Sequence, residues 1–375
     1  MLFKLHGTCT INQQNLRLRL LLQTLERVRA EIADSNVWVQ VDETTDSVGR
    51  YIANVLVGAM KPDDVCKPHL LVSRELPSTN HATVSRLVND AMAVLWPNGT
   101  EHDRVLLLLS DAAPYMVKAG KAFQVFYPNM VHVTCLAHAL HRVAETVRTT
   151  SKYSNTIISN VRKIFVKAPL RVQVYKEMNP KTPLPPEPVL TRWGTWLAAA
   201  FFYADNYEGI KNAVQALCPT DVLAIAKAQE SLKNPALPGE LAYMKCHFGQ
   251  LVRAITSLEK RDLPMAEALE IISGVEASLS HVVGDIGYQA KAKLSAVLAK
   301  NPGYAVVKAI NDALRGEAIS DAVKLPPALV ACFKNAPLTS VEVERSFSSF
   351  KAILADNRKR MTPQNLEQLL VAHCN

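Results

Sequence analysis

Apolar and polar positions alternate with a short period in the first third of the chain. Val37 to Asp42 reads VWVQVD, and residues 51–60 and 68–76 show the same alternating, β-branched character. Residues 104–110 form a nearly uniform apolar run, which is typical of a strand buried on both faces. Together with a short run at 130–134, the pattern predicts five strands.

Helical spacing of apolar residues surrounds these strands. It predicts helices over 12–34, 82–96, 114–127, 135–149 and 150–180. The resulting order is three successive strands followed by strands that are joined by helices. This is the order of RNase H-like folds, and it differs from the strict βαβ alternation of a doubly wound sheet.

The rest of the chain has helical patterns. A proline-rich stretch at 180–188 predicts an extended connection, 191–330 shows no strand-like run, and two last helices are predicted over 341–354 and 362–373. We therefore predict an α/β fold with an RNase H-like mixed-sheet core that is interrupted by an all-helical insertion domain. The predicted parts are an N-terminal helix (1–34), the first part of the core (35–190), the helical insertion (191–334) and a C-terminal region that completes the core (335–375).

Composition and charge narrow the class of protein only slightly. A chain of 375 residues with 49% hydrophobic residues can bury a sizeable core, and a net charge of +8 permits nucleic-acid binding without requiring it. The seven cysteines form no paired framework, and neither a secretory leader nor a membrane-spanning apolar run is found. We expect reduced thiols, an intracellular protein and no membrane partner.

Three acids occupy positions that suit metal-dependent chemistry. Asp42 ends the first predicted strand, Asp111 follows the fourth, and Glu344 lies in the late helical segment. RNase H-like nucleases place carboxylates at these three points to hold two divalent cations, because Mg²⁺ prefers hard oxygen ligands. Each acid alone is more readily a loop or helix-capping residue, so only their joint placement supports the prediction.

Other acids compete for the same roles. Glu43 and Asp46 are rivals of Asp42, and Glu342 is a rival of Glu344. Acids at 342 and 344 point to different faces of a helix, so only one of the two can reach a common site.

Five motifs in order resemble the hAT transposase superfamily. They are VWVQVDETTD at 37–46, LLLLSDAAPYM at 106–116, CLAHALH at 135–141, TRWGTW at 191–196 and the C-terminal stretch 340–373. A looser likeness connects the chain to relatives of CGG triplet repeat-binding proteins. The resemblance implies metal-dependent DNA cleavage and strand transfer by a DDE triad of Asp42, Asp111 and Glu344 with Mg²⁺ or Mn²⁺. The alternative is a domesticated, catalytically inactive nuclear factor that binds DNA or protein.

The resemblance also implies partners and further site residues. The C-terminal region would support a homo-oligomer in the nucleus, and Trp193 would stack on a DNA base. The residues expected to contact DNA are Arg192, Trp193, Arg345, Lys351, Arg358, Lys359 and Arg360. For these basic residues, and for those at 152–171, an exposed and solvated helix face is an equally good explanation. For Trp193, the alternative is a position in the hydrophobic core. Active family members begin with a BED-type zinc finger, whose pattern is not found here, so recognition of transposon ends is in doubt.

The spacing of Cys135, His138 and His141 invites a zinc interpretation. A four-ligand structural site needs a second pair of ligands, and no second cysteine pair lies nearby. We therefore interpret the motif as packing, with Cys135 buried and His138 hydrogen-bonded.

Overall fold

A computed structural model describes residues 2–64, 67–189, 193–354 and 361–375. The chain forms two compact units, which we describe separately. The first unit contains the sheet and comprises Met1–Leu136, Glu259–Leu269 and Ala299–Asn375. The second comprises Ala137–Leu258 and Glu270–Leu298, so it interrupts the first unit in sequence.

The first unit is built on a five-stranded mixed sheet. Its strands are β1 (Asn36–Thr45), β2 (Tyr51–Met60), β3 (His69–Leu76), β4 (Val105–Ser110) and β5 (Val131–Thr134). The order is β3-β2-β1-β4-β5. The first three strands are antiparallel neighbours, whereas β1, β4 and β5 run parallel. All five predicted strands are confirmed, and every residue of the apolar strand β4 is buried, as its uniform sequence predicts.

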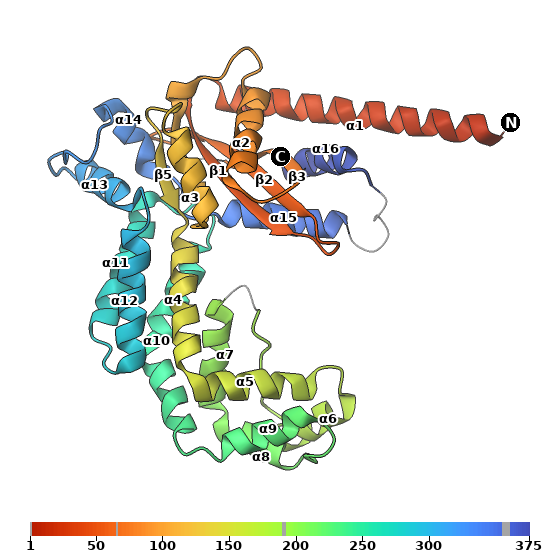
Figure 1. Ribbon diagram of the computed structural model, residues 1–375, viewed down its shortest axis with the longest axis vertical. Helices are drawn as coiled ribbons and strands as arrows, with labels where there is room; N and C mark the ends of the chain where they lie inside the picture. The colour runs from red at the N-terminus through yellow and green to blue at the C-terminus, as the bar shows by residue number, and fades with distance from the viewer. Residues whose placement is uncertain (1, 65–66, 190–192, 355–360) are drawn as a thin grey trace. The chain divides into compact units, whose positions relative to one another are not determined.

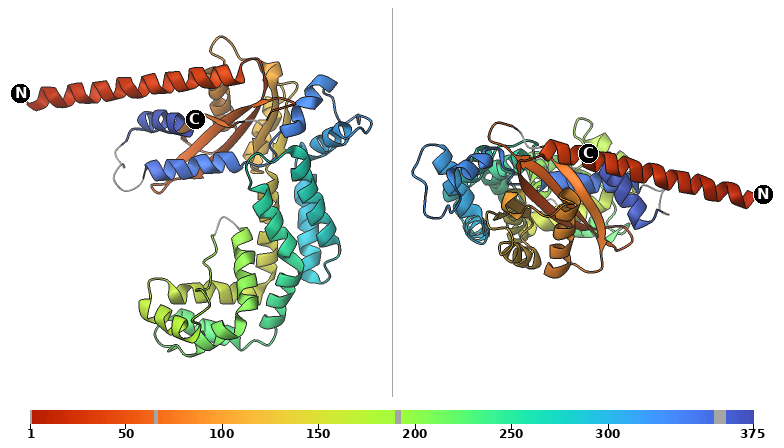
Figure 2. Two further views of the ribbon diagram at one scale, coloured as in Figure 1. Left: turned by 180° about the vertical axis from the view of Figure 1, so that it is seen from behind. Right: turned by 90° about the horizontal axis from the view of Figure 1, so that it is seen from above.

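Helices cover both faces of this sheet. The helices α2 (His81–Leu95) and α3 (Pro114–Phe123) lie on one face, and α15 (Val341–Ile353) and α16 (Pro363–Cys374) lie on the other, as Figures 1 and 2 show. The long helix α1 (Leu2–Ile32) packs against α16. The mixed α/β fold of the prediction is therefore present, and the C-terminal helices belong to the unit that contains the sheet.

One side chain forms hydrogen bonds with the backbone at an edge of the sheet. β5 is an edge strand, and the buried Asn301 lies just before α13 (Tyr304–Leu314), which packs against β5. The Asn301 side chain accepts a hydrogen bond from the Thr134 amide at 3.0 Å and donates one to the Thr134 carbonyl at 2.8 Å. It thus replaces a strand partner, because buried backbone groups need hydrogen bonds.

We expect Asn301→Ala to lower the free energy of unfolding by about 2–4 kcal/mol, because it leaves two buried backbone groups of Thr134 without partners. Urea denaturation of the whole chain measures this loss. Replacing the exposed Asn98 with Ala is a control for the loss of one amide, and its effect should be smaller. An equal loss in both variants would contradict the edge-capping role.

The remaining helices complete the two units. The first unit also contains the short helix α14 (Pro327–Ala331). The second unit contains α4 (Leu136–Thr150), α5 (Lys152–Phe165), α6 (Pro169–Met178), α7 (Trp193–Asp205), α8 (Tyr207–Gln215), α9 (Leu223–Leu232), α10 (Leu237–Leu258), α11 (Met265–Ser280) and α12 (Asp285–Ala299) for most of their length. The helical stretch predicted at 150–180 is divided because Pro169 cannot continue a helix and begins α6.

The described residues of the second unit contain helices and no strand. α7 packs along α10, and α5 packs against α9. This unit begins at Ala137, so α4 to α6 and the proline-rich connection belong to it. In the described parts of the chain, no helix has both the length and the apolar character that a membrane span requires.

Candidate functional site

Asp42 and Asp111 lie just beyond the last paired residues of the parallel strands β1 and β4. Asp111 directly follows β4, but the prediction that Asp42 ends the first strand is wrong, because β1 continues to Thr45 in its pairing with β2. Gln40 of β1 pairs with Leu109 of β4, and two residues further along each strand stand Asp42 and Asp111. Both carboxyl groups are half-buried. Because the parallel pairing of β1 with β4 ends beside both acids, this register brings them to one place, where open α/β sheets bind their ligands.

Local hydrogen bonds orient these two carboxylates. An Oδ1 atom of Asp42 accepts a hydrogen bond from the Glu43 amide at 2.8 Å. The Oδ1 atom of Asp111 accepts one from the Ala113 amide at 3.1 Å, just before α3 begins. Each carboxylate is therefore oriented by a backbone amide one or two residues further along the chain.

Glu43 is a third acid of the same cluster. Burial, followed by the negative charges of Asp111 and Asp42, raises the pKa of Glu43 from 4.5 to about 7. Its Oε2 atom is buried and has no hydrogen-bond partner among the described residues. Asp42, Glu43 and Asp111 (the acidic cluster) therefore interact electrostatically, and carboxylate oxygens are of the donor type that divalent cations prefer.

Glu344 lies on the helix that covers the Asp42 face of the sheet. The Gln40 side chain donates to the Thr339 carbonyl at 2.6 Å, and the Asn54 side chain donates to the Ser346 hydroxyl at 2.6 Å. Gln40 is two residues from Asp42 on β1, so their side chains share a face, and Asn54 is the cross-strand partner of Asp42. The segment that carries the half-buried Glu344 is therefore fixed on this face at both ends.

The structure unites some of the predicted acids and not others. Asp42 and Asp111 come together, and Glu43 joins them electrostatically. Within the described ranges, no three carboxylate, histidine or cysteine side chains are arranged to hold a metal ion, so Glu344 does not complete a three-ligand group here.

The rival acids have other contacts. The Asp46 carboxylate forms an ion pair with Arg50 at 2.7 Å in the turn after β1. Burial alone would raise the pKa of Asp46, but hydrogen bonds from Arg50 and from the Val48 amide hold that pKa below its ordinary value. Glu342 forms ion pairs with Arg345 and, at 3.6 Å, with Arg261. Neither acid belongs to the acidic cluster.

The predicted DNA-contacting residues are described only in part. Arg345 contacts Glu342 and donates to the Glu259 carbonyl at 2.9 Å, and Lys351 is exposed on α15. Trp193 begins α7, and its side chain lies outside the described part of the structure. Arg192, Arg358, Lys359 and Arg360 lie outside the described residues.

The cysteine–histidine motif has a packing role at its first residue. Cys135 is buried, as the packing interpretation predicts, and its Sγ atom accepts a hydrogen bond from the Ser340 amide at 3.1 Å. The neighbouring Leu136 amide donates to the Leu338 carbonyl at 3.0 Å. These bonds attach the end of β5 to the segment before α15. His138 is half-buried in α4.

Sequence reasoning treated Glu43 only as a rival of Asp42. The available signal was the pair of consecutive acids at a strand end, but a pair of this kind does not indicate burial. Burial of Glu43 depends on segments distant in sequence, among them the end of β4 with Asp111, which the sequence of β1 does not specify.

We expect Glu43→Gln to stabilise the chain at pH 8 and to have little effect at pH 4, both in EDTA. The folded state holds the Glu43 proton up to about pH 7 and the unfolded state only to about 4.5, so stability falls as pH rises through this window. Solvent screening at this half-buried side chain reduces the gain to about 1–2 kcal/mol. Urea denaturation at both pH values measures the gain in the free energy of unfolding. An equal effect at both pH values would contradict the raised pKa of Glu43.

Two family models match the chain. A family model described as a domain of unknown function (DUF659) matches residues 18–164, which contain the sheet with Asp42 and Asp111. A model described as the hAT family C-terminal dimerisation region matches residues 335–375, which contain Glu344. No curated protein matches the chain. From these two matches, the chain belongs to the hAT-family transposases or their derivatives.

Proposed function

We propose that this protein is an hAT transposase-like nuclease that cleaves DNA and transfers strands with the help of divalent cations. The observation that carries the proposal is the parallel register of β1 and β4, which brings Asp42 and Asp111 to one edge of the sheet. In this proposal the sheet and its helices are an RNase H-like core. DNA is the substrate, and the nucleus is the site of action.

Asp42 and Asp111 would hold the cation, and Glu344 would contribute from α15. Carboxylates suit Mg²⁺ and Mn²⁺, which when bound activate a water or a terminal hydroxyl and stabilise the leaving oxygen. In cleavage, the water oxygen forms a bond to phosphorus and the bond between phosphorus and the 3′ oxygen breaks, which leaves a hydroxyl and a phosphate.

The residues around the acids have positioning roles. The Ala113 amide orients Asp111, and the Glu43 amide orients Asp42. Gln40 and Asn54 hold the segment of α15 over the sheet through Thr339 and Ser346. Groups held in place before the reaction reduce its entropic cost, which is why these contacts matter for the proposal.

Nicking of a supercoiled plasmid tests the proposal. The whole chain is incubated with the plasmid in Mn²⁺, Mg²⁺, Ca²⁺ or EDTA, and nicked circles are quantified. We expect nicking in Mn²⁺ and Mg²⁺ and none in EDTA. Nicking that is unchanged in EDTA would contradict a metal-dependent reaction.

A derivative without catalysis is the second candidate function. It is favoured by the match of residues 335–375 to a dimerisation region, because self-association does not require catalysis. Such a protein would bind DNA or protein in the nucleus and self-associate through residues 335–375. Concentration-dependent self-association together with DNA binding, in the absence of nicking in every cation, would support this candidate.

A further inference from the structure

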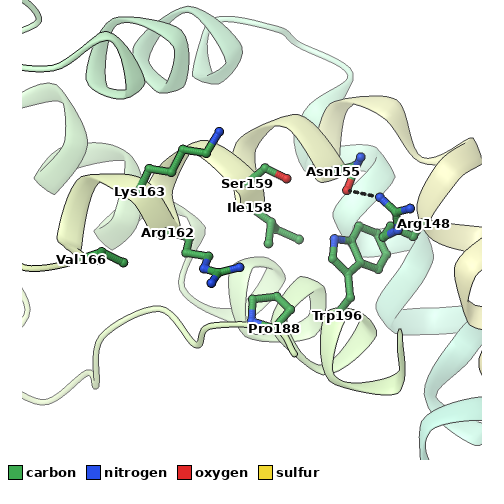
Figure 3. Close-up of a pocket in the computed structure, with 9 residues that line it drawn as sticks. All are labelled: Arg148, Asn155, Ile158, Ser159, Arg162, Lys163, Val166, Pro188 and Trp196. Atoms are coloured by element: carbon green, nitrogen blue, oxygen red, sulfur yellow. Dashed lines mark hydrogen bonds between the residues drawn. The ribbon is translucent and has the colours of Figure 1, made fainter. Parts of the chain in front are cut away.

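A cavity within the helical unit has the character of a binding site. It is open to solvent on one side, has a volume of about 600 Å³, and is formed by α4, α5, α7 and Pro188 of the connection before α7. Figure 3 shows Trp196 on one side, Arg162 on the other, and Ile158 and Pro188 between them. The volume falls within the range of about 300–1,000 Å³ that is usual for small-molecule sites.

A buried hydrogen-bond donor at this cavity has no acceptor. The Trp196 side chain belongs to a residue that is only 3% exposed, and its indole Nε1 has no hydrogen-bond partner among the described residues. In Figure 3 the nitrogen is on the side of the ring that faces Ile158. A buried donor left unpaired costs free energy, so a ligand that supplies an acceptor here would be stabilised.

The charged groups of the cavity are all cationic. Arg148 donates to the Asn155 side-chain oxygen at 3.3 Å, and Arg162 forms an ion pair with Glu187. Lys163 is exposed at the rim and forms no ion pair with the described residues. No carboxylate is among the lining residues that the structure describes. The ligand that complements this lining is an anion with hydrogen-bond acceptors.

We propose that this cavity binds a nucleotide, meaning a flat base that carries a phosphate. The base would lie against Ile158 and Pro188 and accept a hydrogen bond from Trp196, and the phosphate would contact Lys163 and the arginines. Arginine and lysine donate strong charge-assisted hydrogen bonds to phosphate. The nucleotide can be free in solution or be the end of a DNA strand, since both present the same chemistry.

Calorimetric titration of the whole chain with a nucleoside monophosphate tests the proposal. The matching nucleoside and inorganic phosphate are titrated in parallel. We expect the monophosphate to bind more tightly than the nucleoside alone and more tightly than inorganic phosphate alone. We expect Trp196→Phe, which removes the indole donor and keeps an aromatic ring, to weaken binding by about three- to tenfold. Lys163→Gln should weaken binding by about tenfold.

Two matched variants test whether the loss of affinity is specific to residues of this cavity. Trp96→Phe removes another nearly buried indole, and Lys152→Gln removes another exposed lysine of α5, so neither should change the affinity. If a 5′-phosphorylated oligonucleotide displaces the monophosphate, the natural ligand can be the end of a DNA strand. If it does not, the ligand is the free nucleotide. No binding of the monophosphate, or binding that Trp196→Phe and Lys163→Gln leave unchanged, would overturn the proposal.

Discussion

Asp111→Asn is expected to lower Mn²⁺-dependent plasmid nicking by at least about 1,000-fold. A cation that stabilises the developing charge is worth several kcal/mol of the barrier, and each 1.36 kcal/mol is about tenfold in rate. The asparagine keeps an oxygen that can accept the hydrogen bond of the Ala113 amide, so the turn before α3 should persist. The rate of nicked-circle formation measures the loss.

Two controls make this result specific. Asp103→Asn neutralises an exposed acid shortly before β4 and should leave the rate unchanged. The melting temperature of Asp111→Asn should stay close to that of the native chain. A folded Asp111→Asn variant that nicks at the native rate would exclude this acid from the reaction.

The same assay distinguishes the two acids of α15. Glu344→Gln should lower the rate strongly if this residue is the third acid. Glu342→Gln should have a smaller effect, because Glu342 is paired with Arg345 and Arg261. The reverse order of the two variants would reassign the acid on this helix.

The second large effect is expected from Gly303→Ala. A Cβ atom at Gly303 would lie 2.4 Å from the His132 carbonyl oxygen and 2.8 Å from a methyl carbon of Val133. The obstacle is backbone of the edge strand β5, which cannot move away without breaking its pairing with β4. We expect the free energy of unfolding to fall by about 1–3 kcal/mol, as is found for overpacked cores.

Urea denaturation of the whole chain, followed by tryptophan fluorescence, measures this loss. Gly239→Ala is the matched control, because a Cβ atom there would meet nothing within 4 Å and alanine favours the helix α10. We expect this control to be neutral or slightly stabilising. Equal denaturation midpoints for Gly303→Ala and the native chain would show that the segment before α13 is not packed against β5.

The sequence predicted the sheet well because its signals were local. The alternation in β1 and the apolar run of β4 are properties of single segments, and they directly reflect burial on one or both faces. The position of Asp111 directly after β4 was also predictable, whereas β1 extends three residues beyond Asp42, because its far end still pairs with β2. The proximity of the two acids required only the correct topology.

Features that depend on distant segments were not predictable in this way. Asn301 caps an edge strand that lies 167 residues away in sequence, and no local pattern marks that role. The raised pKa of Glu43 arises from burial beside Asp111 of another strand. The cavity at Trp196 is formed by α4, α5, α7 and the proline-rich connection. Because these segments are separate in sequence, the basic residues of α5 were equally compatible with a solvated helix face. Each of these features follows from tertiary packing rather than from periodicity.

The central claim is that Asp42 and Asp111 form a divalent cation site, and Mn²⁺ binding tests it most directly. Free Mn²⁺ is measured by electron paramagnetic resonance while the whole chain is titrated, and the native chain is compared with Asp42→Asn, Asp111→Asn and the control Asp103→Asn. We predict saturable binding to the native chain and to the control, and affinities lower by at least about tenfold in the other two variants. Absent binding to the native chain, or equal affinity in all four proteins, would contradict the account.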